Sequence, residues 1–148
     1  CLKHEIAHSR RFGTGFSIVM CDIDHFDEYN SKHGRMRGDA ILRQVGQVLL
    51  NNTRGIDLVC RFGSEEFVVL LSKTDKFGGL AAAEKLRQCI LDEKFEGAHD
   101  SMPDGRLTMS FGVTEFPGDS LNFAERALYI AKQEGRNRSA AWQGPAPG

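Results

Sequence analysis

The spacing of apolar and polar residues divides the chain into strands, helices and turns. Runs rich in β-branched and aromatic residues predict a strand at 15–22, a hairpin within 57–71 that turns at Gly63, and a strand at 107–114. Apolar residues that recur every three or four positions predict helices. These helices span 2–11, 26–33, 37–52, 77–93 and a last segment that begins at Asp119 or Ser120 and ends near Gln133. The polar segment 95–105 is expected to be an exposed loop or a small hairpin.

The order of these elements indicates the fold class. Along the chain they read helix, strand, two helices, hairpin, helix, strand, helix. This is not the strict alternation of strands and helices in a doubly wound fold. We therefore expect an α/β (α+β) sandwich with a mixed, largely antiparallel sheet flanked by helices. The phosphate-binding motifs GxxxxGK[ST] and GxGxxG are absent, so a phosphate would have to bind at the loop 22–27, where the amide groups of a helix N-terminus point outward.

Two acidic sites interrupt the apolar strands. Glu65 and Glu66 lie beside the hairpin turn, although acidic residues are poor strand formers; taken alone, such a pair is typical of a solvated turn. Asp22 and Asp24 follow the first apolar strand. Carboxylates at the end of a central strand that face a carboxylate on a hairpin tip suit Mg²⁺ bound to a nucleoside triphosphate. Asp24 is also placed to cap the next helix, with Asp27 three residues on as in a capping box.

Composition and charge narrow the class of protein. The 148 residues, 41% hydrophobic and 26% charged, are sufficient for one globular domain, expected at 1–140, with a disordered tail or linker at 141–148. A net charge of −1 and a pI near 6.6 argue against a nucleic-acid polymer as partner but leave single nucleotides open. No apolar run is long enough to span a membrane, so we expect no membrane contact by this domain. The four cysteines have no CxxC spacing, which predicts reduced thiols in a cytoplasmic protein.

Five short motifs occur in one order along most of the chain. They are Asp22-Ile-Asp-His-Phe26 with Asn30, Gly38-Asp39, Arg61-Phe-Gly-Ser-Glu-Glu-Phe67, Ser110-Phe-Gly-Val113 and the segment 127–138. Together they closely resemble the GGDEF domains, the diguanylate cyclases, with a variant Gly-Ser-Glu-Glu-Phe signature. The resemblance implies a five-stranded sheet related to the catalytic core of adenylyl cyclases. It also implies that two GTP condense to cyclic di-GMP with loss of two pyrophosphates, across a homodimer with one GTP per subunit, in a bacterial cytoplasm.

The resemblance assigns metal and catalytic roles to the acidic sites. Asp22 and Glu65, with the carbonyl of Ile23, would hold Mg²⁺ or Mn²⁺ against the triphosphate. Glu65 would also help to deprotonate the attacking 3′-hydroxyl, which is easier when a metal ion lowers the pKa of that hydroxyl. Glu66 is expected to steady the turn rather than to touch the metal.

The other substrate contacts also follow from the resemblance. Asn30 and Asp39 would recognise guanine, because an amide offers a donor and an acceptor while a carboxylate accepts from the N1 and N2 hydrogens. Lys132 and Arg136, one turn apart at a helix end, would clamp phosphates. Taken alone, the two cations fit equally well as charges that complement a helix dipole. The remaining positions expected at the nucleotide are Phe26, Asp27, Gly63 and Ser64.

A second site is expected just before the hairpin. Arg54-Gly-Ile-Asp57 has the spacing of the family's inhibitory RxxD site. There Arg54 would fork onto the guanine or phosphate of bound cyclic di-GMP, and Asp57 would pair with guanine. Lys85 is a further candidate cation for this allosteric site. Without the resemblance, an arginine and an aspartate three residues apart would more often be a surface ion pair.

Two substitutions depart from the family pattern. Ser64 replaces the second glycine of the signature, which costs about 1–2 kcal/mol if that position needs a positive φ. Asp27 stands where the family usually has a phosphate-contacting lysine, so its charge should weaken GTP binding. The sequence therefore predicts a feedback-inhibited cyclase or, alternatively, a degenerate domain that binds cyclic di-GMP at Arg54 and Asp57. The family's leading segment is missing, so an N-terminal sensory or regulatory domain is expected in the full protein.

Overall fold

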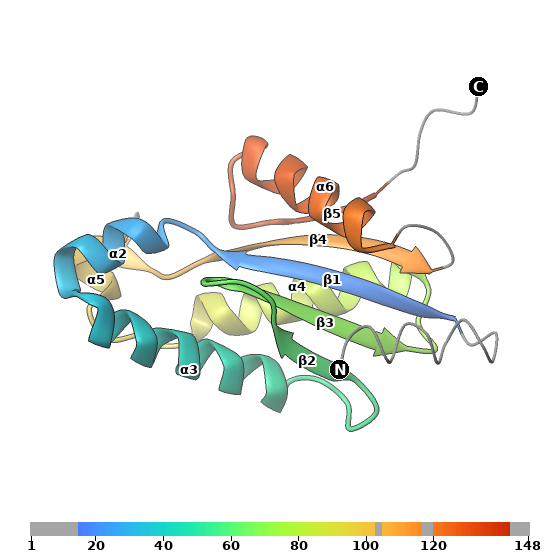
Figure 1. Cartoon of the computed structure of the whole chain (residues 1–148), viewed down its shortest axis with the longest axis horizontal. Coiled ribbons are helices and arrows are strands. Elements are labelled where there is room, and N and C mark those ends of the chain that lie inside the picture. The colour runs from blue at the N-terminus through green and yellow to red at the C-terminus, as the bar shows by residue number, and fades with distance from the viewer. Residues whose placement is uncertain (1–14, 103–104, 117–119, 143–148) are drawn as a thin grey trace.

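A five-stranded sheet forms the centre of the molecule (Figure 1). The computed structural model describes residues 15–102, 105–116 and 120–142. The strands lie in the order β2-β3-β1-β4-β5, and all neighbouring pairs are antiparallel except the parallel pair β4–β5. Their bounds are Phe16–Ile23 for β1, Leu58–Arg61 for β2, Glu66–Ser72 for β3, Met109–Phe116 for β4 and Ser139–Ala141 for β5. The expected mixed, largely antiparallel sheet is confirmed.

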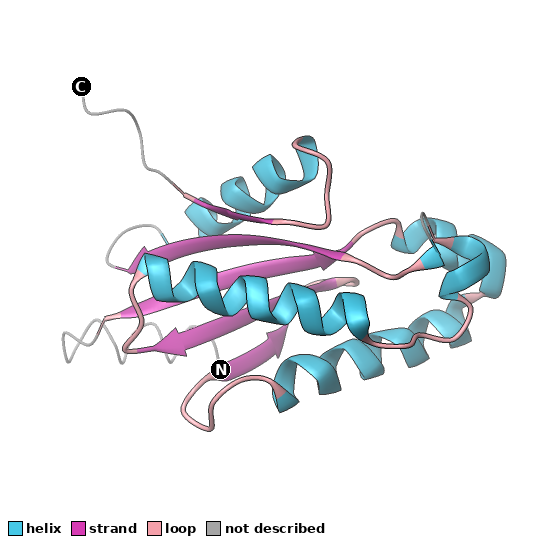
Figure 2. Cartoon of the chain, turned by 180° about the vertical axis from the view of Figure 1, so that it is seen from behind, coloured by secondary structure: helices cyan, strands magenta, loops and turns pink. Residues whose placement is uncertain are grey.

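Helices cover both faces of the sheet (Figure 2). Their bounds are Phe26–His33 for α2, Arg35–Asn51 for α3, Lys76–Asp92 for α4, Ala98–Ser101 for α5 and Ser120–Gln133 for α6. One apolar cluster joins the sheet to α2, α3, α4 and α5, and a smaller one joins the other face to α6. The predicted helices from α2 onward are confirmed to within two residues at their ends. The helix predicted at 2–11 and the cap predicted at Asp119 lie outside the described residues.

The central strand β1 supplies side chains to both apolar clusters. Val19 and Cys21 belong to the cluster with α3 and α4, whereas Ile18 and Met20 belong to the cluster with α6. Successive side chains of a strand point to opposite faces. The same period of two therefore directs Asp22 toward α6.

The backbones of α6 and β4 approach each other very closely where the helix crosses the strand. A Cβ atom added to Gly112 would lie 2.2 Å from the backbone nitrogen of Leu128 and 2.3 Å from the carbonyl oxygen of Ala124. Only glycine can occupy a position with so little space. This close contact fixes the depth at which α6 packs on the sheet.

Three parts of the chain differ in detail from the sequence prediction. The alternation of apolar and polar residues in β4 indicates packing on one face, but Ser110 and Thr114 on its second face are also buried, because α6 covers them. The segment 95–105 contains the short helix α5. The five strands implied by the family resemblance are confirmed, but the sequence pattern did not place the fifth, β5; it ends at Ala141, one residue beyond the expected end of the domain. Residues 143–148 of the expected tail lie outside the described residues.

Two expectations from composition can be compared with the structure. Cys21, Cys60 and Cys89 are not in disulfide bonds. Cys21 is fully buried, and burial raises the pKa of its thiol, so it is a packed, unreactive side chain. Among the described residues, no helix is long and apolar enough to cross a membrane.

Candidate active site

The centre of the site is the carboxylate of Asp22 at the end of β1. In the sheet this residue lies between Glu66 of β3 and Ser110 of β4. Its Oδ2 atom accepts a 2.6 Å hydrogen bond from Nζ of Lys132, which α6 presents from above. Its Oδ1 atom is buried and has no hydrogen-bond partner in the described part of the chain. Burial raises the pKa of Asp22, Lys132 opposes this rise, and the negative charges of Asp24 and Asp27 add to it.

Glu65 joins Asp22 from the tip of the β2–β3 hairpin. The backbone N–H of Ile23 donates to the carbonyl oxygen of Glu65 at 3.4 Å, which holds the tip against the end of β1. Burial raises the pKa of Glu65 from its ordinary value of 4.5 to about 7, with a further contribution from the charge of Asp22 and then that of Asp27. The two carboxylates are therefore close enough to repel each other, and the site carries an excess of negative charge.

The raised pKa of Glu65 makes the stability of the free domain depend on pH. A carboxyl group whose pKa is higher in the folded state binds its proton more tightly there, so its stabilising contribution is complete below about pH 4.5 and is lost as the pH rises through about 7. We expect the free energy of unfolding to fall between these pH values and to fall less in Glu65→Gln. Denaturant unfolding at several pH values would measure this. Glu134→Gln, at an exposed glutamate that lines a different pocket beside β5, is the matched control. An unchanged slope in Glu65→Gln would contradict the prediction.

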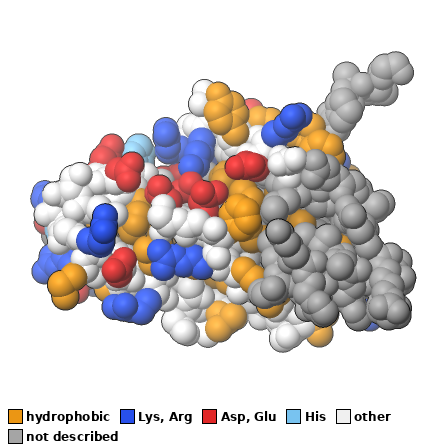
Figure 3. Space-filling view, in the orientation of Figure 1, with side chains coloured by type: hydrophobic (Ala, Val, Ile, Leu, Met, Phe, Trp, Pro, Cys, Tyr) orange, Lys and Arg blue, Asp and Glu red, His pale blue; other side chains and the backbone are white. Residues whose placement is uncertain are grey.

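The two carboxylates line a pocket of about 240 Å³. The lining residues come from the segment 22–28, the hairpin tip and the end of α6: Asp22, Ile23, Asp24, His25, Phe26, Asp27, Glu28, Glu65, Lys132 and Arg136. In the space-filling view, acidic and basic side chains lie next to each other over this part of the molecule (Figure 3). The structure thus brings together most of the residues expected at the metal and phosphates.

The loop before α2 differs from the predicted capping box. The N-cap residue of α2 is His25, in a left-handed conformation with φ 58°, and it has no side-chain cap hydrogen bond. The prediction that Asp24 caps this helix is wrong. The buried carboxylate of Asp24 accepts hydrogen bonds from Thr108 just before β4, from Ser110 in β4 and from the segment after α6. Asp27 is exposed in the first turn of α2, where its charge faces Asp22 and Glu65.

The hairpin turn does not show the strain that we considered for Ser64. Neither Gly63 nor Ser64 is among the described residues with positive φ. Arg61 stabilises the turn, since its Nη2 atom donates to the carbonyl oxygen of Ser64 at 2.9 Å. The Oε1 atom of Glu66 lies 3.0 Å from the position that a Cβ on Gly63 would take, so Glu66 packs against the turn.

The residues expected to recognise guanine lie outside this pocket. The Oδ1 atom of Asn30 is buried and has no partner among the described residues. It lies 1.9 Å from the position of a Cβ on Gly38, so Asn30 takes its place only because residue 38 is glycine. Asp39 is exposed near the start of α3, next to Gly38.

The two expected phosphate cations belong to different local structures. Lys132 lies in the last turn of α6, whereas Arg136 lies beyond the end of the helix at Gln133 and has a left-handed φ of 64°. The backbone N–H of Arg136 donates to the carbonyl oxygen of Ala131 at 3.0 Å, which turns the chain back over the helix end. Both side chains line the pocket beside Asp22.

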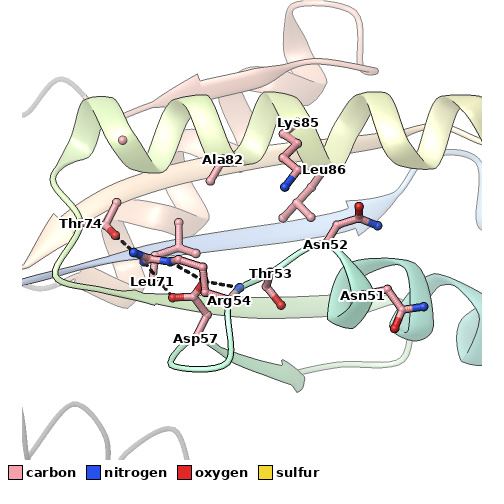
Figure 4. Close-up of a pocket in the computed structure, with 11 residues that line it drawn as sticks. Asn51, Asn52, Thr53, Arg54, Asp57, Leu71, Thr74, Ala82, Lys85 and Leu86 are labelled. Carbon is pink, nitrogen blue, oxygen red and sulfur yellow. Dashed lines mark hydrogen bonds and ion pairs between the residues drawn. The ribbon is translucent and has the colours of Figure 1, made fainter.

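A second pocket, of about 420 Å³, lies beside the other end of the hairpin (Figure 4). Arg54 forms a two-pronged contact with Asp57, from Nε to Oδ2 at 3.1 Å and from Nη2 to Oδ1 at 2.9 Å. The side chain of Asp57 is 2% exposed, whereas that of Arg54 is 53% exposed. Nη2 of Arg54 also donates to Thr74, and Lys85 lines the same pocket from α4. Arg54 and Asp57 thus form an ion pair, and the pair faces a pocket.

Comparison with known proteins identifies the family. The sequence profile described as "Diguanylate cyclase, GGDEF domain" matches residues 1–138. The chain belongs to the GGDEF family. The expectation from the five motifs is confirmed.

Relatives and solved structures agree with this assignment. Diguanylate cyclase DosC of Escherichia coli K12 is 38% identical over 146 residues, which cover 95% of this chain and 31% of DosC. The GGDEF domain of DgcB from Caulobacter crescentus, solved with c-di-GMP, is 25% identical with a TM-score of 0.84 and covers 95% of this chain and 85% of that one. The active GGEEF domain from Vibrio cholerae has a TM-score of 0.84 at 24% identity, over 96% of this chain and 92% of that one, and supports the fold.

Sequence reasoning about this GGDEF domain missed the role of Asp24. Its carboxylate is buried and accepts from Thr108, Ser110 and Asn137. Ser110 and Asn137 lay within the motifs but had no assigned role. The period of two along β1 offered a signal, because it places Asp24 on the same face as Asp22 if the strand continues. The local capping pattern gave a competing explanation.

Proposed function

We propose that this domain is a diguanylate cyclase that condenses two GTP into cyclic di-GMP with release of two pyrophosphates. The observation that carries the proposal is the Oδ1 atom of Asp22, which is buried beside Glu65 and has no hydrogen-bond partner among the residues that the structure describes. A buried oxygen without a partner is costly, and a metal ion bound to a triphosphate would satisfy it. Two carboxylates and the carbonyl of Ile23 are a hard oxygen set of the kind that Mg²⁺ or Mn²⁺ prefers.

The residues of the pocket account for the charge of the substrate. Bound Mg²⁺ would supply charge neutralisation at the triphosphate and a lower pKa for the attacking hydroxyl. Lys132 and Arg136 would hold phosphate oxygens from the opposite side, and Phe26, Gly63 and Ser64 would lie along the nucleotide.

Proton transfer is the proposed role of Glu65. In each of two steps, a 3′-oxygen attacks the α-phosphorus of the other GTP, the bond to the β-phosphate oxygen breaks, and pyrophosphate leaves. The attacking hydroxyl must lose its proton. Glu65 would accept that proton at the metal site, where a bound cation would lower the pKa of the attacking hydroxyl.

Two further proposals follow from the shape of the site. The pocket has room for the reacting part of one nucleotide, so the second GTP would come from a second subunit in a homodimer. Asn30 and Asp39 would hydrogen-bond guanine, and the unpartnered Oδ1 of Asn30 is an acceptor available to the base.

Product feedback is proposed for the second pocket. Arg54 is half exposed at its rim, and its two-pronged guanidinium could form the same geometry with a phosphate or a guanine edge of cyclic di-GMP. Lys85 adds a second cation from α4. Asp57 would then supply an acceptor to guanine.

A second candidate function is that of a catalytically weak domain that acts as a receptor for cyclic di-GMP. The observation that favours it is the charge of Asp27, which raises the pKa values of Asp22 and Glu65 and opposes a triphosphate. Under this proposal the pocket at Arg54 and Asp57 would carry the function without turnover.

The wider setting is also a proposal. The chain spans between about a fifth and a third of the length of these curated relatives, for example 21% of DgcP from Pseudomonas aeruginosa, 31% of DosC and 33% of PleD from Caulobacter vibrioides. We propose that a regulatory or sensory domain controls the cyclase in a bacterial cytoplasm, and that its partners are GTP, cyclic di-GMP and a second copy of the domain.

The decisive experiment uses a dimeric form of the domain. The chain, fused to a dimeric coiled coil, would be incubated with GTP and Mg²⁺, and the products would be analysed by mass spectrometry. Cyclic di-GMP that is absent with Glu65→Gln would support the cyclase. A verified dimer that forms no product but binds cyclic di-GMP would contradict it and support the receptor.

Asp27→Lys is expected to strengthen GTP binding. Replacing the anion by a cation removes repulsion from the phosphates and lowers the pKa values of Asp22 and Glu65. We expect the KM for GTP to fall by about tenfold, the change that corresponds to 1.4 kcal/mol. Steady-state kinetics of the dimeric fusion would measure it. The control for net charge is Asp92→Lys, at an exposed acidic residue at the end of α4 that is not among the residues lining the pocket. Equal effects of the two variants would show that Asp27 does not meet the phosphates.

A further inference from the structure

Asp24 is a charged residue that the proposed chemistry does not use. It is 2% exposed and lies two residues from Asp22. Its Oδ1 atom accepts from Oγ of Ser110 at 2.7 Å, and its Oδ2 atom accepts from Oγ1 of Thr108 at 2.8 Å and from the backbone N–H of Asn137 at 2.9 Å. No lysine or arginine is among these three partners. A buried carboxylate is costly unless donors compensate for the lost water, and here three neutral donors do so.

The third donor is the most informative. Asn137 has a left-handed φ of 46°, directly after Arg136 with a left-handed φ of 64°. Consecutive left-handed residues other than glycine are unfavourable and persist only where neighbouring groups hold them. Asp24 holds the backbone of Asn137, while Nη1 of Arg87 on α4 donates to its side-chain Oδ1 at 3.1 Å. The turn after α6 is thus anchored on one side to Asp24, the residue that follows β1, and on the other side to α4.

The geometry points to Asp24 as a positioning residue for the phosphate clamp. By accepting the N–H of Asn137, it fixes the left-handed turn and so directs Arg136 into the pocket beside Lys132 and Asp22. This inference rests on the proposed binding of a nucleoside triphosphate there. The positioning role explains why a carboxylate is buried close to a phosphate site. Asp24 is needed there to hold the N–H of Asn137, and its hydroxyl and amide donors stabilise its negative charge.

Measurements of nucleotide binding can distinguish a positioning role of Asp24 from a general contribution to folding. The probes are a GTP analogue with a methylene group between the α- and β-phosphorus atoms, which cannot react, and guanosine, which has no phosphate. Titration calorimetry with Mg²⁺ would follow the analogue, and chemical-shift titration would follow guanosine. Because neither measurement requires turnover, a failure to dimerise does not affect them.

Three variants test the role of the tether. Asp24→Ala removes it, and we expect binding of the analogue to weaken by about tenfold, the usual size of one hydrogen bond to a charged group, with guanosine unchanged. Asp24→Asn should restore binding, because its carbonyl can accept from Asn137 while its NH₂ group donates to Ser110. Thr108→Val is the matched control, since it removes a different hydrogen bond from the same Oδ2 atom.

A double-mutant cycle with Arg136→Gln tests whether Asp24 acts through that residue. If it does, the loss in Asp24→Ala and the loss in Arg136→Gln will not add in the double variant. Hydrogen exchange of the Asn137 amide, followed by NMR, should be faster in Asp24→Ala and unchanged in Asp24→Asn. If Asp24→Ala does not fold, Asp24→Ser replaces it, because a serine side chain is too short to reach Asn137 yet remains polar toward Ser110.

The outcomes are distinct. Equal losses for the analogue and guanosine, additive losses with Arg136→Gln, or an Asn137 amide that stays protected in Asp24→Ala would each overturn the positioning role. A folded wild-type domain that does not bind the analogue would instead overturn the proposed function. In that case hydrogen exchange of the Asn137 amide would still show whether Asp24 holds the turn.

Discussion

Replacement of Asp22 by asparagine is expected to lower the rate of cyclic di-GMP formation by at least about a thousandfold, the upper end of what one electrostatic contact in an active site contributes. The variant keeps the shape of the side chain and an oxygen that can face Lys132. It removes the negative charge of the carboxylate, whose Oδ1 atom has no hydrogen-bond partner within residues 15–102, 105–116 and 120–142. Product formation by the dimeric fusion, followed by mass spectrometry, would measure the loss.

The same substitution should stabilise the free domain. The raised pKa of Asp22 means that its charged form is disfavoured in the folded state. A neutral side chain removes the cost of burying that charge and, to a smaller extent, the repulsion from Asp24 and Asp27. Glu66→Gln is the control, because Glu66 lies directly opposite Asp22 in the sheet and its pKa is also raised, but it has no proposed metal contact. A Glu66→Gln variant as inactive as Asp22→Asn would argue that the rate depends on the total charge rather than on Asp22.

Gly112→Ala is expected to destabilise the fold by at least about 3 kcal/mol, since overpacking against backbone cannot be relieved by a change of rotamer. The new Cβ atom would lie 2.2 Å from the backbone nitrogen of Leu128. The whole of α6 must move away from β4, and the contact between Lys132 and Asp22 must lengthen with it. Denaturant unfolding would measure the loss of stability.

Gly46→Ala provides the matched control for this substitution. Gly46 lies inside α3, and a Cβ there would make an ordinary contact with Phe67 at 3.6 Å. Alanine in a helix interior is favoured over glycine by about 1 kcal/mol, so this variant should be more stable than the wild type. If the two substitutions had similar effects, the crossing of α6 and β4 would not be the tight contact that the structure shows.

Most of the fold could be predicted because its elements follow local rules. Apolar runs gave β1 and the hairpin, and helical periodicity gave α3, α4 and α6. The sequence pattern did not place a strand at β5 because Ser139–Ala141 contains no β-branched or aromatic residue. It becomes a strand because the turn after α6 brings the chain back alongside β4, whose backbone groups can pair with it.

The candidate site was predictable to the extent that it repeats a family pattern. Position along the chain indicated Asp22, Glu65 and Lys132, which the structure places in one pocket. Asp24 was assigned to a cap because capping rules consider only adjacent residues. Its partners Thr108, just before β4, and Ser110, in β4, lie 84 and 86 positions away. Whether Ser64 was strained could not be decided without its backbone angles.

The ion pair between Lys132 and Asp22 has a consequence for the order in which ligands arrive. In the free domain an ammonium group already occupies Oδ2 of Asp22, so a divalent cation alone would have to compete with it. A triphosphate gives Lys132 a new anionic partner and releases the carboxylate. Under the proposed chemistry, nucleotide and metal therefore increase each other's affinity, and by linkage the two increases are equal. The metal site would remain largely unoccupied with magnesium alone, and magnesium and nucleotide would bind together.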